Sequence, residues 1–101
     1  MGRVIWTEPA LADVREIVEF IGKDSRRYAL KLADRITTAC RSLAKQPQSG
    51  GRVPEFDVDS VREIIVRPYR VIYHIRGDDC HVVAVIHGAR DLPQIIELTD
   101  Q

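Results

Sequence analysis

The stretch from residue 62 to residue 91 constrains the fold more than any other part of this 101-residue chain. It lies in a region that alternates short strand-like runs with tight turns. Three runs are rich in β-branched and aromatic side chains, which favour strands: 61–67, 69–76 and 81–87. Pro68 marks the first turn because proline cannot donate to a β-ladder, and Gly77-Asp78-Asp79-Cys80 marks the second. The pattern predicts three consecutive antiparallel strands.

Two amphipathic segments precede these strands. Thr7 is placed to cap a first helix, whose apolar residues recur at helical spacing: Leu11, Val14, Ile17, Val18 and Ile21. Asp13 is expected on the opposite, solvent-facing side. After a break at Gly22-Lys23-Asp24, Ser25 begins a second helix. Its apolar stripe includes Ala29, Leu32, Ala33, Ile36, Cys40 and Leu43. The short break predicts an αα-hairpin.

These elements predict one α+β domain over residues 1–101, in the order β-α-α-β-β-β, with a short opening strand within residues 3–6. The helical hairpin covers about 8–46, the sheet about 61–88, and a C-terminal tail 92–101. Neither helix is long enough to be stable alone. We therefore expect the N-terminal hairpin to pack on one face of a small antiparallel sheet.

The hairpin turn sets which strand residues share a face. With Asp78-Asp79 as a two-residue turn, four pairs face one another: Arg76 with His81, His74 with Val83, Ile72 with Val85, and Arg70 with His87. The other face then carries Val71, Tyr73, Ile75, Val82, Ala84 and Ile86. This apolar face is predicted to receive the helices, and Tyr73 is predicted to belong to the core. The face with arginine and histidine is predicted to meet water or a partner.

The formal net charge is zero, so no overall field draws the chain to nucleic acid or to an anionic membrane. The charges are nevertheless unevenly spread. Residues 25–54 carry seven basic and one acidic side chain, whereas residues 1–24 carry three basic and five acidic ones, and residues 55–101 five basic and nine acidic ones. The basic second helix is either a solvated surface or a contact for nucleic acid or an acidic protein partner.

No apolar run is long enough to span a bilayer, and Trp6-Thr7-Glu8-Pro9 interrupts the N-terminal segment that a secretory signal would need. Cys40 and Cys80 form no ligand cluster and read as reduced thiols, with Cys40 on the apolar side of a helix. The three histidines lack the close spacing of a zinc site. We expect a cytoplasmic protein without metal or other cofactor.

The order of elements resembles the RelE/ParE toxins of bacterial type II toxin–antitoxin systems, and several motifs carry the likeness. These are Ile5-Trp6-Thr7, the link with Leu43, Pro47, Ser49-Gly50 and Arg52, then Arg67-Pro68-Tyr69-Arg70, and His87-Gly88-Ala89-Arg90-Asp91. The last two look more like the ParE branch. The doubled Gly50-Gly51 departs from the single glycine that is more usual in the family.

The resemblance implies a toxin that inhibits growth and is held in a hetero-oligomer by a cognate antitoxin. The ParE branch is associated with plasmid stabilisation and with inhibition of DNA gyrase, which needs a binding surface rather than an enzyme's catalytic groups. The RelE branch is associated with cutting mRNA on the ribosome. A third alternative is a toxin fold without activity. Binding of ribosomal RNA calls for a strongly basic protein, so a neutral chain with three lysines favours gyrase as the target.

Three sets of candidate residues follow from these readings. The expected target-binding residues are Arg67, Arg70, His74, Arg76, His87 and Arg90. If the chain is a ribonuclease, the catalytic candidates are Arg62, Arg70, His87 and Glu55. The antitoxin is expected to lie on apolar residues of the helical hairpin or on a sheet edge. The hairpin residues are Leu11, Val14, Val18, Ile21, Leu32 and Ile36.

Overall fold

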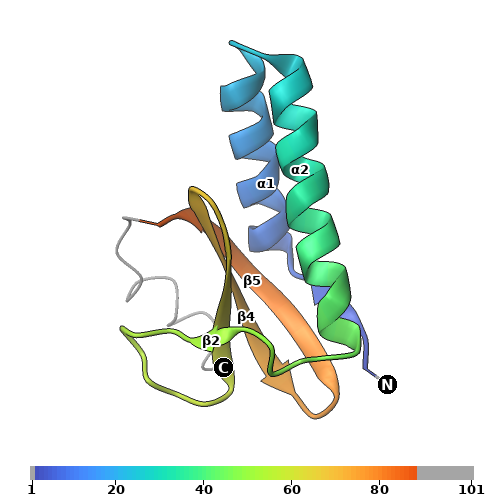
Figure 1. Ribbon diagram of the computed structural model, residues 1–101, viewed down its shortest axis with the longest axis vertical. Coiled ribbons are helices and arrows are strands. Elements are labelled where there is room, and N and C mark those ends of the chain that lie inside the picture. Colours follow the sequence, from blue (N-terminus) through green and yellow to red (C-terminus); the bar gives the residue numbers. More distant parts are fainter. Residues whose placement is uncertain (1, 89–101) are drawn as a thin grey trace.

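The computed structural model describes residues 2–88, and the remaining residues, 1 and 89–101, are not described. Its elements in chain order are β1 (Val4–Trp6), α1 (Glu8–Gly22), α2 (Arg26–Arg41), a 3-10 turn (Ser42–Ala44), β2 (Gly51–Arg52), β3 (Val61–Val66), β4 (Tyr69–Arg76) and β5 (Asp79–His87). The two helices form a hairpin beside the sheet, and the far end of the hairpin projects beyond it (Figure 1). The predicted α+β architecture is confirmed.

The five strands form one sheet in the order β1-β5-β4-β3-β2. Strand β1 runs parallel to β5, whereas the other neighbours are antiparallel. The sheet is therefore mixed, not purely antiparallel as expected. The chain reaches this arrangement because the helical hairpin carries it from β1, at one edge, to β2, at the other.

Both helix starts are capped as predicted. The Thr7 hydroxyl accepts a hydrogen bond from the Ala10 N–H at 3.4 Å, and the Ser25 hydroxyl accepts one from the Tyr28 N–H at 3.1 Å. Thr7 also donates its hydroxyl proton to the Val82 carbonyl at 2.8 Å. The first cap thus fixes the start of α1 to strand β5.

The helices and one face of the sheet enclose the main core. Its helical members are Ala10, Leu32, Ile36 and Cys40, followed by Leu43 in the 3-10 turn. The sheet contributes Val66, Val71, Tyr73, Cys80, Val82 and Val85, with Ile75 packed at the edge of the cluster. The placement of Val71, Tyr73, Ile75 and Val82 on the helix-facing side is confirmed.

The predicted register between β4 and β5 is wrong. The two-residue turn is Gly77-Asp78, where Gly77 takes a positive φ of 60°, so Arg76 pairs with Asp79 and His74 with His81. This first shift moves the pairing by two residues, which keeps each side chain on its expected face.

A second irregularity follows within β5. The pairing changes between Ile72 and Tyr73, where Tyr73 faces Val82 but Ile72 faces Ala84, so Val83 is an extra residue. Beyond this β-bulge the faces of β5 are inverted relative to the prediction. Val85 lies in the helix-facing core, whereas Ala84 and Ile86 pack on the opposite face.

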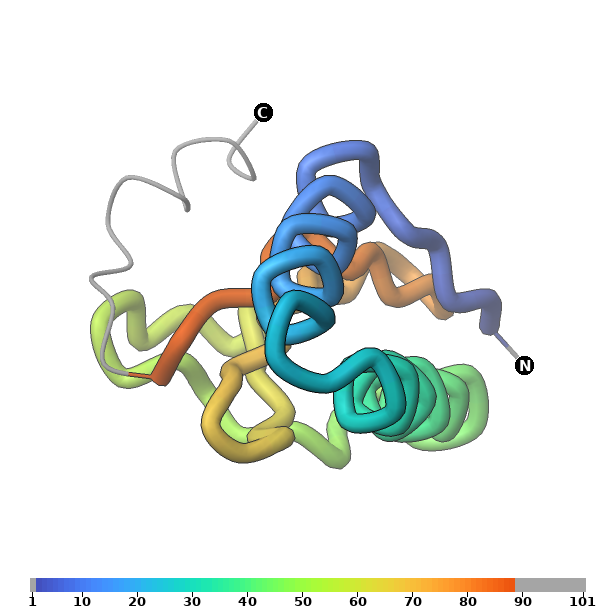
Figure 2. Tube along the Cα trace, turned by 90° about the horizontal axis from the view of Figure 1, so that it is seen from above, coloured from blue at the N-terminus to red at the C-terminus, as the bar shows by residue number. Residues whose placement is uncertain are grey.

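That opposite face, predicted to be open, is covered by the loop of residues 53–60. Val53 and Phe56 from the loop pack with Ile72, Ala84 and Ile86 in a second apolar cluster that also contains Val61. Residues 53–60 lie on the side of the sheet away from α2 (Figure 1 and Figure 2). The sheet therefore has a core on each face, and only part of the expected polar face reaches solvent.

Asp13 also differs from its expected place on the solvent side of α1. Its Oδ2 accepts a hydrogen bond from the Val85 N–H at 2.9 Å. Strand β1 pairs with β5 only as far as Val82, so α1 replaces it along the rest of that edge. The carboxylate satisfies a backbone donor that the short β1 does not reach.

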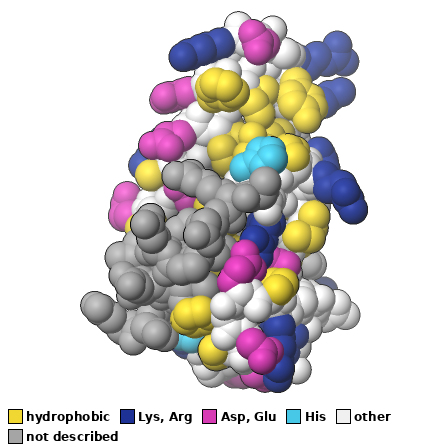
Figure 3. All heavy atoms as spheres, turned by 90° about the vertical axis from the view of Figure 1, so that its left-hand side faces the viewer, with side chains coloured by type: hydrophobic (Ala, Val, Ile, Leu, Met, Phe, Trp, Pro, Cys, Tyr) yellow, Lys and Arg dark blue, Asp and Glu magenta, His cyan; other side chains and the backbone are white. Residues whose placement is uncertain are grey.

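Charges on the helical hairpin are segregated by helix. In Figure 3, Lys and Arg are more frequent along one edge of the helical part and Asp and Glu along the other, although a basic side chain also lies near the top of the acidic edge. Among the large apolar side chains that remain exposed, Phe20 on α1 is 71% exposed, and Tyr28 and Leu30 on α2 are about half exposed. The outer surface of the hairpin is therefore both charged and partly apolar.

Candidate functional site

Arg70 lies at the centre of a charged cluster on the sheet face away from the helices. Its Nη1 and Nη2 donate to the two carboxylate oxygens of Glu55 at 2.8 and 2.9 Å. Its Nε donates to Glu63 Oε1 at 2.7 Å, so one guanidinium is shared by two carboxylates. The Arg70 side chain is only 9% exposed.

These contacts fix the ionisation of the cluster. The hydrogen bond from Arg70 lowers the pKa of Glu55, and the same bond raises the pKa of Arg70. Glu55 is therefore an anion at neutral pH and a weak proton acceptor. Arg70 has its donors engaged within the protein, and it holds the loop that carries Glu55 against the sheet.

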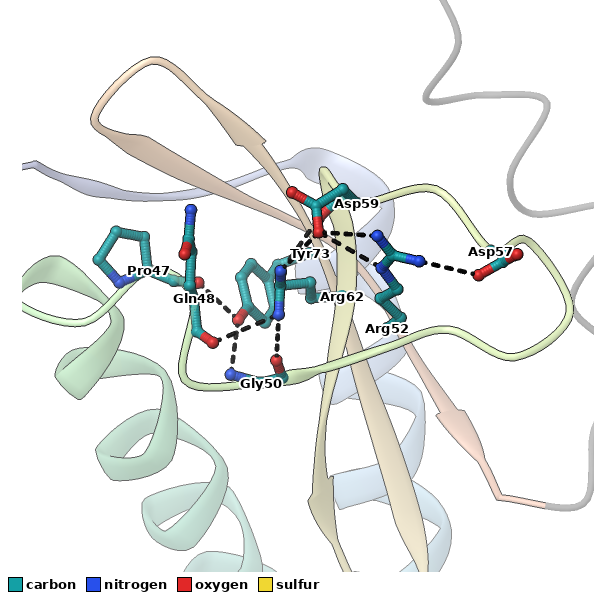
Figure 4. A network of polar contacts seen from close by, with 8 residues as sticks. All are labelled: Pro47, Gln48, Gly50, Arg52, Asp57, Asp59, Arg62 and Tyr73. Carbon is teal, nitrogen blue, oxygen red and sulfur yellow. Dashed lines mark hydrogen bonds and ion pairs between the residues drawn. The ribbon is translucent and has the colours of Figure 1, made fainter.

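Arg62, the other arginine of the ribonuclease set, organises the link between α2 and β3. Its Nε donates to the Asp59 carbonyl at 3.0 Å and its Nη2 to Asp59 Oδ1 at 2.9 Å. Its Nη1 donates to the carbonyl of Gly50 at 2.9 Å and to that of Gln48 at 3.3 Å (Figure 4). Arg62 thus joins two segments of the chain and is structural.

Arg52 extends the same network toward the loop. Its guanidinium donates to Asp59 Oδ1 at 3.3 Å and to Asp57 Oδ1 at 3.2 Å (Figure 4). Asp57 has a positive φ of 46°, which a short polar side chain tolerates better than most. Both carboxylates are well exposed, so these pairs shape the loop and add little stability.

Tyr73 is fully buried, as predicted for a core residue. Its hydroxyl donates to the Pro47 carbonyl at 2.7 Å and accepts from the Gly50 N–H at 3.0 Å (Figure 4). Burial raises the pKa of this phenol. A Cβ at Gly50 would lie 2.6 Å from the hydroxyl, whereas one at Gly51 would meet no atom within 4 Å. Gly50 is therefore the required glycine of the pair.

His87 does not share a face with Arg70. It pairs with Tyr69, on the helix-facing side, while Arg70 pairs with Ile86. The rings of Tyr69 and His87 meet edge to face with centroids 5.9 Å apart. The four ribonuclease candidates are thus not assembled into one site.

The target-binding set divides between the two ends of the sheet. Arg67 and His87 are exposed at one end, where the Gly88 N–H donates to the Pro68 carbonyl at 2.8 Å. His74 and Arg76 lie toward the other end of β4, with Arg76 Nε donating to His74 Nδ1 at 3.2 Å. Strand β4 is eight residues long, so the two ends are about 23 Å apart. Arg90 lies outside the described residues.

The antitoxin-binding set is also divided. Leu32 and Ile36 are buried in the main core and offer no surface in this fold. Leu11 and Val14 line a shallow groove with Trp6 and Thr37, between the start of α1 and the second half of α2. Val18 and Ile21 are half-buried on α1, and Ile21 packs against the core.

Sequence reasoning missed two roles at this site. Asp59 forms ion pairs with both Arg52 and Arg62, and Glu55, expected as a catalytic candidate, forms an ion pair with Arg70. Strand alternation could have placed Glu63 beside Arg70, since each is a polar residue on the same face of a neighbouring strand. Nothing in the sequence fixes how an irregular loop places Glu55 or Asp59.

Within residues 2–88, no three His, Cys, Asp or Glu side chains come together in a way that could hold a metal ion. In the same range, neither helix has the length and apolar character that crossing a membrane requires.

Comparison with known proteins identifies the family. Residues 4–92 match the family described as ParE toxin of type II toxin-antitoxin system, parDE. The chain is 36% identical to Toxin RelE2 of Caulobacter vibrioides over 91 residues, which are 89% of this chain and 99% of the relative. It is also 35% identical over 98 residues to the protein Y4kP of Sinorhizobium fredii, covering 93% and 96% of the two chains.

The fold matches a solved structure as well. The chain aligns with one titled "Chromosomal ParDE TA system from P. aeruginosa", with a TM-score of 0.71 and 22% identity over 86% of this chain and 96% of the other. At that identity the likeness is one of fold. The family match over most of the chain, together with the relatives that align along nearly their whole length, is decisive: the chain belongs to the RelE/ParE family of toxins of type II toxin–antitoxin systems.

Proposed function

We propose that this toxin acts as a ParE-like inhibitor of DNA gyrase and that a cognate antitoxin neutralises it. The observation that carries the proposal is the engagement of Arg70 by both Glu55 and Glu63. A toxin that works by binding needs a stable surface, and this cluster stabilises one. A ribonuclease would instead need the same guanidinium to face a phosphate.

Metal-independent RNA cleavage requires a base, an acid and a cation directed at one scissile phosphate. Here Arg70 is neutralised, Glu55 is ion-paired, and Arg62 is bonded to backbone and Asp59. His87 belongs to the other face of the sheet. The Caulobacter relative is named RelE2, which favours the ribonuclease alternative. The arrangement of the ribonuclease candidate residues in this chain does not support it.

The exposed end of the sheet with Arg67 and His87 is the proposed gyrase contact. The hydrogen bond between Gly88 and Pro68 keeps the β3–β4 turn beside the end of β5. The chain continues from this point into residues 89–101, which include Arg90. His74 and Arg76, at the far end of β4, serve as a natural comparison because they carry similar charge away from this surface.

The proposed antitoxin contact is the groove lined by Leu11 and Val14, which suits an apolar face of a partner helix. A second contact is the outer edge of β3. Strand β2 pairs only with Arg62 and Glu63, so within the described residues the edge of β3 that faces away from β4 has no strand partner from Ile64 onward. Ile65 on this edge is 53% exposed. A partner segment could add a strand there.

The deciding experiment incubates the purified chain with DNA gyrase, ATP and supercoiled plasmid, then digests bound protein and separates DNA forms on a gel. Linear plasmid that carries covalently bound gyrase is the expected product. Arg67→Ala with His87→Ala should weaken this effect, and His74→Ala with Arg76→Ala should leave it close to the parent. If Arg67→Ala with His87→Ala left the amount of linear plasmid unchanged and His74→Ala with Arg76→Ala abolished it, the gyrase contact would lie at the other end of β4.

A chain that arrests growth without producing linear plasmid would overturn the gyrase assignment. The next measurement would then be mRNA cleavage in a ribosome-dependent translation mixture. If the chain is an enzyme, Arg70→Lys should lower the cleavage rate by orders of magnitude while binding persists. Addition of the antitoxin, encoded by a neighbouring small gene, should suppress whichever activity is found.

A further inference from the structure

The outward face of α2 is rich in exposed cations. We call this the basic face, and its members are Arg26, Arg27, Lys31, Arg35, Arg41 and, just beyond the helix, Lys45. All six are exposed. One acidic residue, Asp34, lies among them.

These cations differ from the arginines of the chain that form ion pairs. Among residues 2–88, the ion pairs join Arg3, Arg52, Arg62 and Arg70 to carboxylates, and none includes a cation of the basic face. Within the part of the chain that the structure describes, no carboxylate lies within ion-pair distance of these cations. The charge of the basic face is therefore directed at solvent and is available to a partner.

The position of Arg26 and Arg27 runs against the preference of the helix itself. The first turn of α2 contains no acidic residue, although the positive end of a helix dipole favours carboxylates there. Helix α1 follows the rule, with Glu8 in its first turn. Cations at this end of a helix lower its stability, and departures from a local rule of this kind are expected at functional sites.

We propose that the basic face of α2 binds the phosphate backbone of double-stranded DNA without regard to sequence. Arg27, Lys31 and Arg35 repeat every four residues, and the basic face from Arg27 to Arg41 extends over about 21 Å of helix, with Lys45 beyond its end. A duplex presents roughly six phosphates per strand over that length. A row of cations along a straight rod matches an evenly charged polyanion.

Other partners fit this face less well. Phosphate contact alone needs no pocket, whereas a tightly bound acidic peptide would gain its affinity from a central apolar anchor. The three grooves described in this fold are lined by none of these cations. Single-stranded nucleic acid would favour several aromatic platforms between the cations. Helix α2 offers one exposed aromatic side chain near them, Tyr28, and the outermost residues between Lys31 and Arg41 are Asp34 and Thr38.

The proposal goes beyond gyrase inhibition and stands without it, because it concerns binding of DNA by the toxin alone. It would place the toxin on the duplex that a topoisomerase also holds. The chain is neutral overall, so binding should be weak and should depend on the local field of α2 rather than on net charge.

The test measures fluorescence anisotropy of a labelled 20-base-pair duplex titrated with the purified chain at 25 to 200 mM salt. The logarithm of affinity should fall against the logarithm of salt with a slope of about −4, as for four to five neutralised phosphates. Two duplexes of unrelated sequence should bind equally. The variant Lys31→Glu with Arg35→Glu should bind at least about tenfold more weakly at low salt, with a slope shallower by about two.

The matched control is Arg15→Glu with Lys23→Glu, which changes net charge by the same amount at exposed positions outside the basic face. It should retain most of the parent's affinity, and Lys31→Gln with Arg35→Gln should show a smaller loss than the reversal. Thermal unfolding of each variant checks that folding is intact.

Three results would overturn the proposal. One is no binding of duplex DNA at low salt, and another is equal loss in the control and the basic-face variant. The third is tighter binding of single-stranded RNA than of duplex DNA, which would assign the face to a different partner. A gyrase assay on the same variants is scored separately, so loss of DNA binding and loss of gyrase inhibition can be told apart.

Discussion

The carboxylate of Asp13 accepts a hydrogen bond from the Val85 N–H at 2.9 Å, and this bond joins α1 to the edge of β5 beyond the end of β1. The donor follows the β-bulge at Val83, where the strand is displaced from a regular ladder. A helix side chain therefore completes the hydrogen bonding of a strand. The position of α1 over the sheet depends on a polar contact as well as on its apolar stripe.

Asp13→Ala should lower the free energy of unfolding by about 1–3 kcal/mol, because a partly buried backbone donor loses its acceptor. Asp13→Asn keeps an oxygen at the same place and should cost less. Urea unfolding followed by circular dichroism provides the measurement. Glu16→Ala, on the exposed side of α1, is the control and should change stability by less than about 0.5 kcal/mol. Equal effects at both positions would contradict this role.

Gly50→Ala should destabilise the chain by about 1–3 kcal/mol, because the new Cβ would overlap the Tyr73 hydroxyl and the Glu63 carbonyl, each 2.6 Å away. Gly51→Ala meets open space and should lie within about 0.5 kcal/mol of the parent. Thermal denaturation of the two variants under one condition compares them directly. The reverse order of stability would show that the second glycine is the constrained one.

The Arg70 cluster should make stability depend on pH in the acid range. The hydrogen bond from Arg70 holds the pKa of Glu55 below its ordinary value of 4.5 in the folded chain. The stabilisation is then present above pH 4.5 and is lost as the pH falls through the lower folded value. Glu55→Gln should lower stability by about 1 kcal/mol near pH 7, since the Glu55 side chain remains 32% exposed.

The pH test follows the urea midpoint of the parent and of Glu55→Gln from pH 7 down to pH 3. The difference between them should shrink as the acid lowers the contribution of Glu55. Other carboxylates affect both chains alike, so the difference isolates this group. A difference that stays constant over the whole range would mean that Glu55 contributes through shape and not through charge.

Cys40 and Cys80 should be inert toward thiol reagents in the folded chain. Both are buried, and burial raises the pKa of Cys40 to about 12 and also raises the pKa of Cys80. The thiolate, which is the reactive form, is then scarce and shielded. A colorimetric disulfide reagent at pH 8 should react slowly without urea and rapidly with both thiols once urea unfolds the chain. Rapid reaction of either thiol under native conditions would contradict the structure.

The parts of the fold that follow from local patterns were predictable. Thr7 and Ser25 mark the N-terminal caps of the two helices, and apolar residues spaced at about 3.6 residues predict the buried face of each helix. The register of β5 was not, because Val82, Val83, Ala84, Val85 and Ile86 form an unbroken apolar run. Such a run has no alternation to show which side chains point to which face, and it hides the bulge at Val83.

The candidate site was less predictable than the fold. The sequence singles out Arg70 as a cation on a strand, but its partners come from a neighbouring strand and from a loop without periodicity. Whether Glu55 is a free base or a fixed counterion depends on the path of residues 53–60. That path is set by the burial of Val53 and Phe56, a long-range packing effect that one-dimensional patterns do not carry.

The double covering of the sheet has a consequence for how the molecule opens. Strand β4 has strands on both sides and apolar clusters on both faces, whereas β1 and β2 lie at the edges. Its amide protons should therefore be the last to exchange with deuterated water, at rates that report complete unfolding. The amide protons of residues 53–60, which lie outside the strands at the second face, should exchange earlier than those of β4.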